Sequence, residues 1–388
     1  MTKKYFHNFN GLRFYFASYI AIIHIEEIKA ALGLPALYPK YKFLEVIGIS
    51  AITLFFVMSG FLISYFLLNE KIKNPDSTID IKKFYKSRVL RIWPLYFLCM
   101  IIYWILLPNS FMHELYDKIY FVKFYPVLQE IQFSKAMYFT LFMFFLPQLA
   151  GAIAHVYGGM VLYAGHFWSI GSEELFYLLW PILLYKFKSY KRIFIVGFAF
   201  IYSWYILLII MFIINRLFIK DSQLTSILLT ATAFLSLTRL YCMLIGGLFA
   251  YLYIKKHPFL NFVRKKSVVI ISLIILAIMG LNAIDFPFLI HEIYALLWSV
   301  LIIHFVKDDV KYGWLNSKFV SYMGTISYGI YMYHNFVIIV VIYFALYFGI
   351  KNIILFNVFV HVLTLVFTYL ISHISYQYFE VKFLKLKK

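Results

Sequence analysis

The chain is poor in charged residues and in cysteine. Only 14% of its 388 residues are charged, and Asp and Glu number 17 against 36 Lys and Arg. About a quarter of the residues in a water-soluble protein are charged, so this composition excludes an ordinary soluble fold. The two cysteines, Cys99 and Cys242, lie in apolar runs and are too few for a disulfide framework or a metal cluster.

Long apolar runs are the dominant feature of the sequence. Hydrophobic residues make up 63% of the chain and aromatic residues 22%. A run of about 20 apolar residues is long enough to cross a bilayer as a helix. We therefore predict an all-α, polytopic membrane bundle of about ten transmembrane helices. The predicted spans cover residues 11–29, 44–69, 90–107, 167–185, 193–214, 226–254, 267–281, 289–306, 320–348 and 353–378.

One apolar run, at 138–150, is too short to cross the membrane comfortably. It ends in Pro147 and Gly151. Irregular or broken helical segments at membrane depth are tolerated where they are buried in protein, so we expect an interfacial or re-entrant piece here.

The basic residues predict how the chain is oriented. With the N-terminus inside, the predicted inner segments hold 25 Lys and Arg and the outer segments hold 9. This asymmetry follows the positive-inside rule and places both termini in the cytoplasm. We expect a multi-pass protein of the cell membrane, in bacteria the cytoplasmic membrane, with residues 1–388 forming a single transmembrane domain and no appended soluble domain. The basic residues form no continuous array, so nucleic acid is not an expected partner; the lipid bilayer is.

Arg13 and His24 are two ionisable residues in the first predicted span. They are 11 residues apart, which on an α-helix places them within about 20° of each other and roughly 16 Å apart along the axis. Ionisable groups inside a bilayer usually face a cavity or a partner. A histidine that merely hydrogen-bonds a neighbour would account for His24 alone, whereas the cation in line with it favours a functional helix face.

A second polar motif, residues 165–181, opens the fourth predicted span with Trp168, Ser169, Glu173 and Glu174. The helix dipole stabilises carboxylates in a first turn, which accounts well for Glu174. It accounts less well for Glu173, which we place roughly 9 Å below the outer surface. His24 reaches a similar depth from the other side. Because a carboxylate beside a histidine is a common general base, we predict that His24 and Glu173 are catalytic.

Arg88 and Arg91 lie three residues apart at the cytoplasmic start of the third predicted span. Pro94 follows in what we take to be the first turns, where proline is tolerated. The two arginines are either ordinary positive-inside anchors or a fork for the phosphates of a cytosolic ligand.

Two weaker polar features lie in other spans. Ser59 and Gly60 form a small notch in a bulky apolar helix, for which close helix packing is the simplest explanation. Ser327, Tyr331 and His334 share one face of the ninth span, with Tyr328 in the same segment. A polar stripe in a bilayer faces protein or water, so we expect it to line the interior.

These motifs, in this order, resemble the acyltransferase-3 family of integral membrane acyltransferases. The resemblance runs from about residue 6 to residue 381. It includes Arg13 and His24 after Asn10-Gly11, the segment 55–61, the Arg88-x-x-Arg91 pair, the segment 168–177 and the segment 326–334. Two departures stand out. Relatives often carry a proline after the acid near the C-terminus, but here Glu380 precedes Val381, and many relatives append an extracytoplasmic esterase-like domain.

The resemblance implies transfer of an acyl group, most often acetyl, from cytosolic acyl-CoA to a carbohydrate hydroxyl on the far side. It implies that Arg13 and His24 form an Arg-x10-His pair and that Glu173 is the essential acid. Acyl-CoA is then a donor substrate, and we expect no permanently bound cofactor and no metal. The expected contacts to acyl-CoA or acceptor are Arg13, Arg88, Arg91, Ser59, Trp168, Ser169, Ser327, Tyr328, Tyr331 and His334.

Two alternatives remain at this stage. A transporter or flippase for a lipid-linked glycan would also need about ten spans with internal polar groups, but it often shows inverted repeats, and none is visible. An enzyme of the same family with a different acyl group or acceptor fits equally well. Direct transfer and an acyl-histidine intermediate are both open, and Ser327, Tyr328 or a backbone N–H are candidate oxyanion stabilisers.

Overall fold

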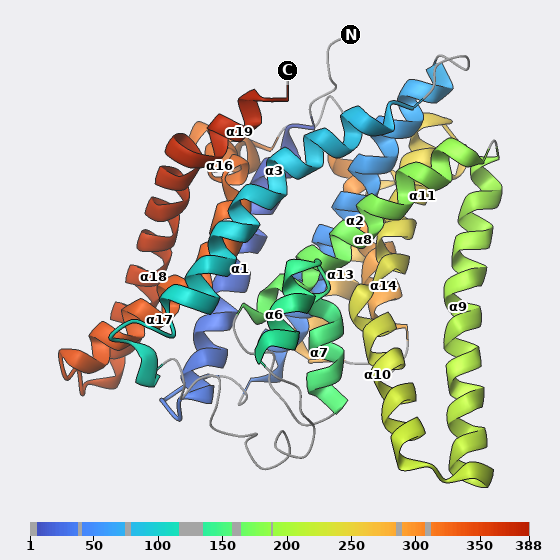
Figure 1. The fold of residues 1–388 in the computed structure, drawn as a ribbon. Helices are drawn as coiled ribbons and strands as arrows, with labels where there is room; N and C mark the ends of the chain where they lie inside the picture. The colour runs from blue at the N-terminus through green and yellow to red at the C-terminus, as the bar shows by residue number, and fades with distance from the viewer. Residues whose placement is uncertain are drawn as a thin grey trace. The chain divides into compact units, whose positions relative to one another are not determined.

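The computed structural model describes residues 6–37, 41–73, 79–115, 135–156, 164–187, 189–284, 289–306 and 312–387. All regular secondary structure within these ranges is helical (Figure 1), which confirms the all-α prediction. Six described helical segments are long and apolar enough to cross a membrane. They are Lys42–Asn69, Ile81–Leu106, Tyr190–Ile219, Ser222–Ile254, Ser327–Tyr347 and Ile353–Lys385.

Four further helices match the remaining predicted spans. α13 (Lys266–Leu281) and α14 (Ile290–Phe305) are apolar but only 16 residues long each. α1 (Asn8–Ala31) and α8 (Trp168–Lys186) are 24 and 19 residues long and carry the charged residues of the first and fourth spans. The protein is therefore a polytopic helical membrane protein.

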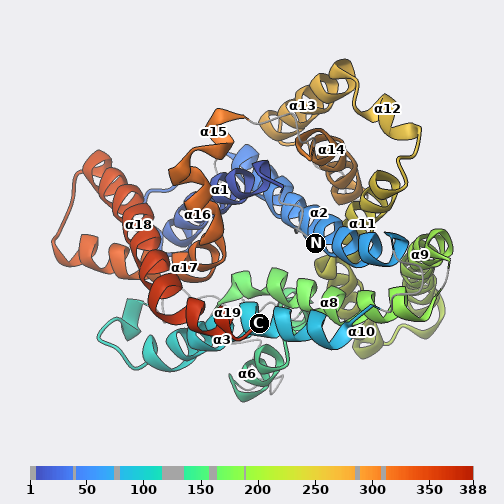
Figure 2. The ribbon, with the colours of Figure 1, turned by 90° about the horizontal axis from the view of Figure 1, so that it is seen from above.

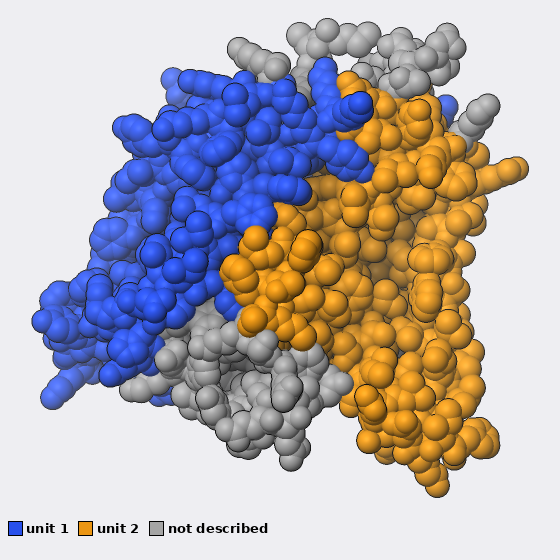
Figure 3. All heavy atoms as spheres, in the orientation of Figure 1, with its two compact units in different colours: residues 1–55, 82–119, 255–388 blue, residues 56–81, 120–254 orange. Residues whose placement is uncertain are grey.

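The chain forms two compact units, coloured blue and orange in Figure 3, whose residue ranges alternate along the sequence. Unit 1 comprises residues 1–55, 82–119 and 255–388, and unit 2 comprises residues 56–81 and 120–254. The helix α2 (Lys42–Lys73) passes from the first unit into the second. Because the units interleave, neither corresponds to one continuous stretch of sequence.

Unit 1 is built around α1. This helix packs against α15 (Gly313–Asn316), α16 (Lys318–Thr325), α17 (Ser327–Tyr347) and α18 (Ile353–Ser375). The helices α17 and α18 run side by side, as do α13 and α14, which follow the short α12 (Phe259–Val263) (Figures 1 and 2). A buried apolar cluster joins α1, α16 and α17 through Phe14, Ala17, Val320, Met323, Ile326 and Ile330.

Two helical stretches of unit 1 contain π-helical turns. α3 (Ile81–Ile101) continues into η1 (Ile102–Leu106), and α18 continues through η4 (Tyr376–Glu380) into α19 (Val381–Lys385). No proline follows Glu380, so the backbone N–H groups beyond it can continue the helix. Single π-helical turns within α-helices frequently occur at functional sites.

Unit 2 contains α8 together with shorter and longer helices around it. α7 (Pro147–Val156) packs against α6 (Lys135–Met143), α8 and α10 (Ser222–Thr238). α9 (Tyr190–Ile214), extended by η3 (Asn215–Ile219), packs against α10 and α11 (Leu240–Ile254). The short η2 (Gly165–Phe167) precedes α8.

Glycines allow α2 and α11 to approach closely in unit 2. A Cβ atom on Gly60 would collide with the backbone of Met243, and one on Gly246 would collide with the backbone of Val57. The notch at Ser59-Gly60 thus serves helix packing through its glycine, as the sequence suggested.

Two predicted spans are interrupted in the structure. The span predicted at 226–254 is two helices, because Arg239 between α10 and α11 adopts a left-handed conformation (φ 44°). The span predicted at 320–348 is likewise divided at Ile326. The short run at 138–150 forms parts of α6 and α7, neither of which is long enough to cross. Apolar composition continues through each of these breaks, so it does not reveal them.

The third span begins earlier than its apolar run. α3 starts at Ile81, so Pro94 lies in the interior of the helix and not in its first turns. Residues 81–90 are rich in lysine and arginine, so their low hydropathy predicts a loop, although the backbone is helical. Proline lacks the N–H that would bond the carbonyl of Leu90, which loosens the helix just beyond Arg91.

Candidate active site

Arg13 and His24 lie on one continuous helix, α1, as their spacing predicted. The Arg13 guanidinium donates a hydrogen bond to Asn10 Oδ1 at 3.4 Å. Asn10 in turn donates to the backbone carbonyl of Ser321 in α16 at 3.2 Å. The cation at the N-terminal end of this helix is therefore placed by a contact that reaches across to a neighbouring helix.

His24 contacts a second histidine, His334 of α17. The His24 Nδ1 and His334 Nε2 atoms are 2.6 Å apart, and the ring planes differ by 19°. The ring centroids are 4.9 Å apart, which exceeds the N–N distance by about two ring radii, so the rings meet edge to edge in nearly one plane. The contact is therefore an imidazole–imidazole hydrogen bond and not a face-to-face stack.

The opposite edge of the His24 ring faces a carboxylate. His24 Nε2 lies 3.8 Å from Glu27 Oε2, one helical turn further along α1. Asn335, beside His334 in α17, also interacts with the His24 side chain. The His24 side chain is 18% exposed, and that of Glu27 is 41% exposed. His334, by contrast, is completely buried.

The polar stripe predicted on α17 is buried in unit 1. Ser327, Tyr331 and His334 all have relative exposures below 10%, and the Tyr331 and His334 ring centroids are 5.6 Å apart. Tyr328 points elsewhere, because its hydroxyl donates to the Ile92 carbonyl of α3 at 3.0 Å. The side chain of Tyr328 thus ties two helices together.

Tyr103 in η1 holds α17 on both sides of His334. Its hydroxyl accepts from the N–H of Phe336 at 2.8 Å and donates to the carbonyl of Met332 at 3.2 Å. In an uninterrupted α-helix this N–H would bond that carbonyl directly. The tyrosine hydroxyl contacts both groups from a neighbouring helical segment. Nothing in the sequence marks Tyr103, since it is one of many aromatic residues in an apolar run.

Glu173 is held by two hydroxyl groups in unit 2. Ser59 Oγ donates to Glu173 Oε1 at 2.6 Å, and the Tyr177 hydroxyl donates to Glu173 Oε2 at 2.7 Å. We predicted that Ser59 contacts substrate, and the structure shows it contacting the acid. We did not predict a role for Tyr177, although its position four residues after Glu173 on a helix was an available signal.

Trp168 and Ser169 lie at the start of α8, beside the break between α10 and α11. The Arg239 guanidinium carbon lies 4.9 Å from the centre of the Trp168 ring, a cation–π contact. Ser172 donates to the Leu237 carbonyl at 3.2 Å, while Ser169 donates to the carbonyl of its own segment at His166, 3.4 Å away. Arg239 is buried, and its only sequence signal was its position in the middle of an apolar span.

Arg88 and Arg91 lie on one face of α3, as their spacing predicted. The Arg88 guanidinium carbon is 5.5 Å from the centre of the Phe84 ring. Arg91 is exposed and interacts electrostatically with Glu380 in η4. Glu380 is buried and accepts a hydrogen bond from Ser375 at 3.2 Å. An exposed arginine near a buried carboxylate is held in place without losing its access to a ligand.

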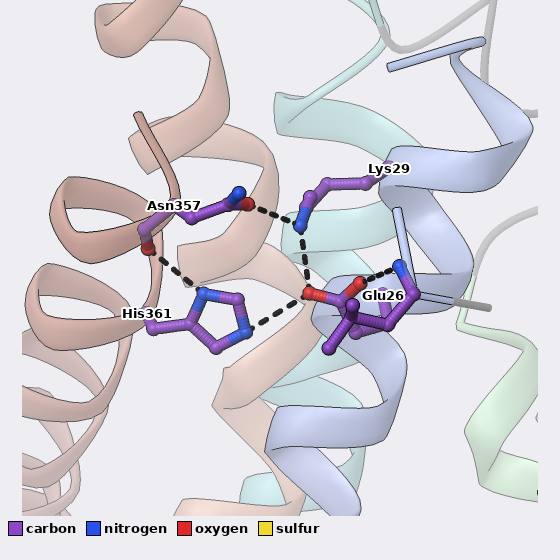
Figure 4. Close-up of polar contacts among 5 residues, drawn as sticks. Glu26, Lys29, Asn357 and His361 are labelled. Carbon is purple, nitrogen blue, oxygen red and sulfur yellow. Dashed lines mark hydrogen bonds and ion pairs between the residues drawn. The ribbon is translucent and has the colours of Figure 1, made fainter. Parts of the chain in front are cut away.

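A buried ion-pair cluster joins the C-terminal end of α1 to α18 (Figure 4). Lys29 donates to Glu26 at 2.7 Å and to Asn357 at 2.5 Å, and His361 Nε2 lies 3.0 Å from Glu26. The second oxygen of Glu26 accepts from the backbone N–H of Leu37 at 2.5 Å. Glu26 and Lys29 are 2% and 1% exposed. Lys29, the last residue of the first predicted span, lies inside α1.

The predicted site residues fall into two sets. Arg13, His24, Arg88, Arg91 and the α17 residues belong to unit 1, whereas Ser59, Trp168, Ser169 and Glu173 belong to unit 2. The pairing of His24 with Glu173 joins the two units and stays a prediction. Among the described residues, no three His, Cys, Asp or Glu side chains group as metal ligands would.

The chain is similar to known proteins over most of its length. A profile of the acyltransferase domain matches residues 6–373, nearly the whole chain. The chain belongs to the acyltransferase-3 family. This confirms the resemblance drawn from the five motifs.

The family's curated members include three similar proteins named O-acetyltransferase OatA, from Staphylococcus aureus strains NCTC 8325 / PS 47, COL and MRSA252. Each is 26% identical over 363 residues, covering 86% of this chain and 52% of the relative. The chain thus spans about half the length of the curated relatives it matches. No solved structure matches it significantly.

Proposed function

We propose that this acyltransferase-3 protein moves an acyl group, in the first instance acetyl, from cytosolic acyl-CoA to a hydroxyl of a cell-surface carbohydrate. The family and the name of the curated relatives support O-acetyl transfer. The observation that carries the proposal is the environment of His24, a partly exposed imidazole on the same helix as Arg13. One ring nitrogen contacts His334, and the other lies 3.8 Å from Glu27.

The chemistry requires one base and one leaving group. His24 Nε2 removes the proton from the acceptor hydroxyl while the oxygen attacks the thioester carbonyl. The tetrahedral intermediate collapses, the C–S bond breaks, and the thiolate of CoA leaves. The proton on His24 then returns to this sulfur. The products are the ester and CoA with a free thiol, and the enzyme is unchanged.

Arg88 and Arg91 supply the cationic groups for the CoA phosphates in this proposal. The two side chains share a face in the first half of α3, on the side of the membrane that the positive-inside rule predicts to be cytoplasmic. Arginine binds phosphate oxygens through two parallel N–H bonds, which gives both affinity and orientation. The rise from Arg13 to His24, roughly 16 Å, is comparable with the reach of an extended pantetheine arm.

Isotope transfer in proteoliposomes tests the proposal. The purified protein is reconstituted with acetyl-labelled CoA on one side and an extract of lipid-linked or cell-wall glycans on the other. We expect label to become covalently attached to glycan, and His24→Ala to abolish this transfer while CoA still binds. A His24→Ala protein with full activity would overturn the mechanism, and movement of unmodified glycan without covalent label would indicate a flippase.

The control for this assay is His304→Ala. His304 lies in α14 and contacts the Tyr312 hydroxyl at 2.6 Å, and neither residue is assigned to the reaction. Its loss removes a histidine and one hydrogen bond but no proposed reactive group. We expect this variant to transfer label at nearly the wild-type rate.

A further inference from the structure

We infer that His334 is a positioning residue that holds His24 in the tautomer in which Nε2 acts as the base. This inference rests on the proposed acyl transfer. It assigns to His334 a role other than contacting substrate. The argument has three parts: which of the two rings is accessible, where their protons lie, and what holds the second ring in place.

Accessibility separates the roles of the two histidines. His24 is partly exposed, whereas His334 has no exposed surface. A group that takes a proton from a substrate hydroxyl must approach it within hydrogen-bonding distance. His24 meets this condition and His334 does not, so His24 is the base and His334 acts through it.

The shared hydrogen bond links the proton positions of the two rings, since one ring must donate and the other must accept. A neutral histidine carries a proton on one nitrogen, and the other nitrogen is the acceptor. If Nε2 of His24 is to be the base, its proton must lie on Nδ1, and this N–H then donates to Nε2 of His334 across 2.6 Å. His334 therefore takes the part that a carboxylate takes in a catalytic triad, holding the imidazole in the reactive tautomer.

Tyr103 of η1 holds the backbone around His334 in place. The Tyr103 hydroxyl bonds the Met332 carbonyl and the Phe336 N–H, which lie two residues before and two residues after His334. These contacts restrict both the rotation and the shift of α17 at this point. The position of the His334 ring is thus set independently of its bond to His24.

When the acceptor proton reaches Nε2, His24 becomes an imidazolium with a proton on each nitrogen. The Nδ1 proton can then be shared with His334, which spreads the positive charge over two rings. Glu27, 3.8 Å from the Nε2 edge, stabilises the same charge from the other side. Return of the proton to the CoA sulfur restores both neutral rings.

Three variants test this role by kinetics. His334→Ala should lower kcat by about 100-fold with the KM for acetyl-CoA nearly unchanged, because a base in the wrong tautomer is not available. His334→Gln retains an acceptor oxygen for the His24 Nδ1 proton and should recover about tenfold of the loss. Ile338→Ala, one turn further along the same buried face, is the matched control for core disruption. We expect it to lower thermal stability with little change in kcat.

Nitrogen NMR of histidine-labelled protein in lipid provides a readout independent of activity. The His24 signals are identified by their absence from His24→Ala. We expect the neutral Nδ1–H tautomer in the wild type and in His334→Gln, and the Nε2–H tautomer in His334→Ala. An unchanged His24 tautomer in His334→Ala, or equal kcat for His334→Ala and wild type, would overturn the inference. Absence of any labelled glycan with the wild type would instead refute the proposed function, while the tautomer measurement stands by itself.

Discussion

The hydroxyl of Ser59 donates a 2.6 Å hydrogen bond to Glu173, joining a small residue of α2 to the acid of α8. Tyr177 engages the other oxygen of the same carboxylate at 2.7 Å. A carboxylate whose two oxygens both accept hydrogen bonds is held in one orientation. Hydrogen bonds to a charged group contribute about 1.5–3 kcal/mol each, so these contacts are strong enough to keep Glu173 aligned.

We predict that Tyr177→Phe lowers kcat by about tenfold, because it removes one donor while preserving the ring that fills the core. Ser59→Ala should have an effect of similar size, and the double variant should lose less than the product of the two, since both act on one carboxylate. Initial rates of acetyl transfer check this.

The matched control for Ser59 is Ser64→Ala on the same helix. Ser64 accepts a hydrogen bond from the Trp180 indole at 2.8 Å and has no contact with Glu173 among the described interactions. This variant should lose stability without losing kcat. Equal losses of kcat at positions 59 and 64 would contradict a specific role for Ser59.

A second prediction concerns the buried Glu26–Lys29 pair. Lys29→Met should destabilise the protein by about 3–5 kcal/mol, because the Glu26 carboxylate stays buried without its cation. The double variant Lys29→Met with Glu26→Leu should be more stable than Lys29→Met alone, because no charge is then buried without its partner. Thermal unfolding in detergent measures both. A double variant at least as unstable as the sum of the single changes would show that the two charges are not coupled and would contradict this prediction.

A third prediction concerns CoA binding at α3. Arg91→Ala should raise the KM for acetyl-CoA by about tenfold, and the difference between wild type and variant should shrink at high salt, because charge pairing at an exposed site is screened. Lys86→Ala, an exposed cation on the same helix, is the control and should have a much smaller effect. Equal shifts for both variants would indicate that only the net charge of this surface matters.

A fourth prediction concerns Tyr103. Tyr103→Phe removes the hydroxyl that contacts both Met332 and Phe336, so α17 loses this restraint and can shift at His334. We expect kcat to fall by about tenfold with the ring volume preserved. The same variant should broaden the His24 nitrogen signals. An unchanged spectrum together with unchanged kcat would show that Tyr103 does not position His334.

The spatial relations that sequence reasoning predicted correctly are those with a local signal. The spacing of 11 residues places Arg13 and His24 on one face because helical geometry depends only on residue number. The same holds for Arg88 and Arg91 on α3. Tyr103 lacked such a signal, because its partner Met332 lies 229 residues away in the chain. Lys29 has a local partner, Glu26, three residues before it, but its second partner, Asn357, lies 328 residues away.

Composition and periodicity determined by themselves that the chain is a helical membrane protein with ionisable groups in its first span, since a bilayer admits few other arrangements of so apolar a chain. The motif order determined its family. Only the tertiary structure decided that His24 meets His334, that Ser59 holds Glu173, and that Arg239 breaks a span. Hydrogen bonds of this kind depend on distances of a few tenths of an ångström between helices far apart in sequence, and no residue pattern along one helix specifies them.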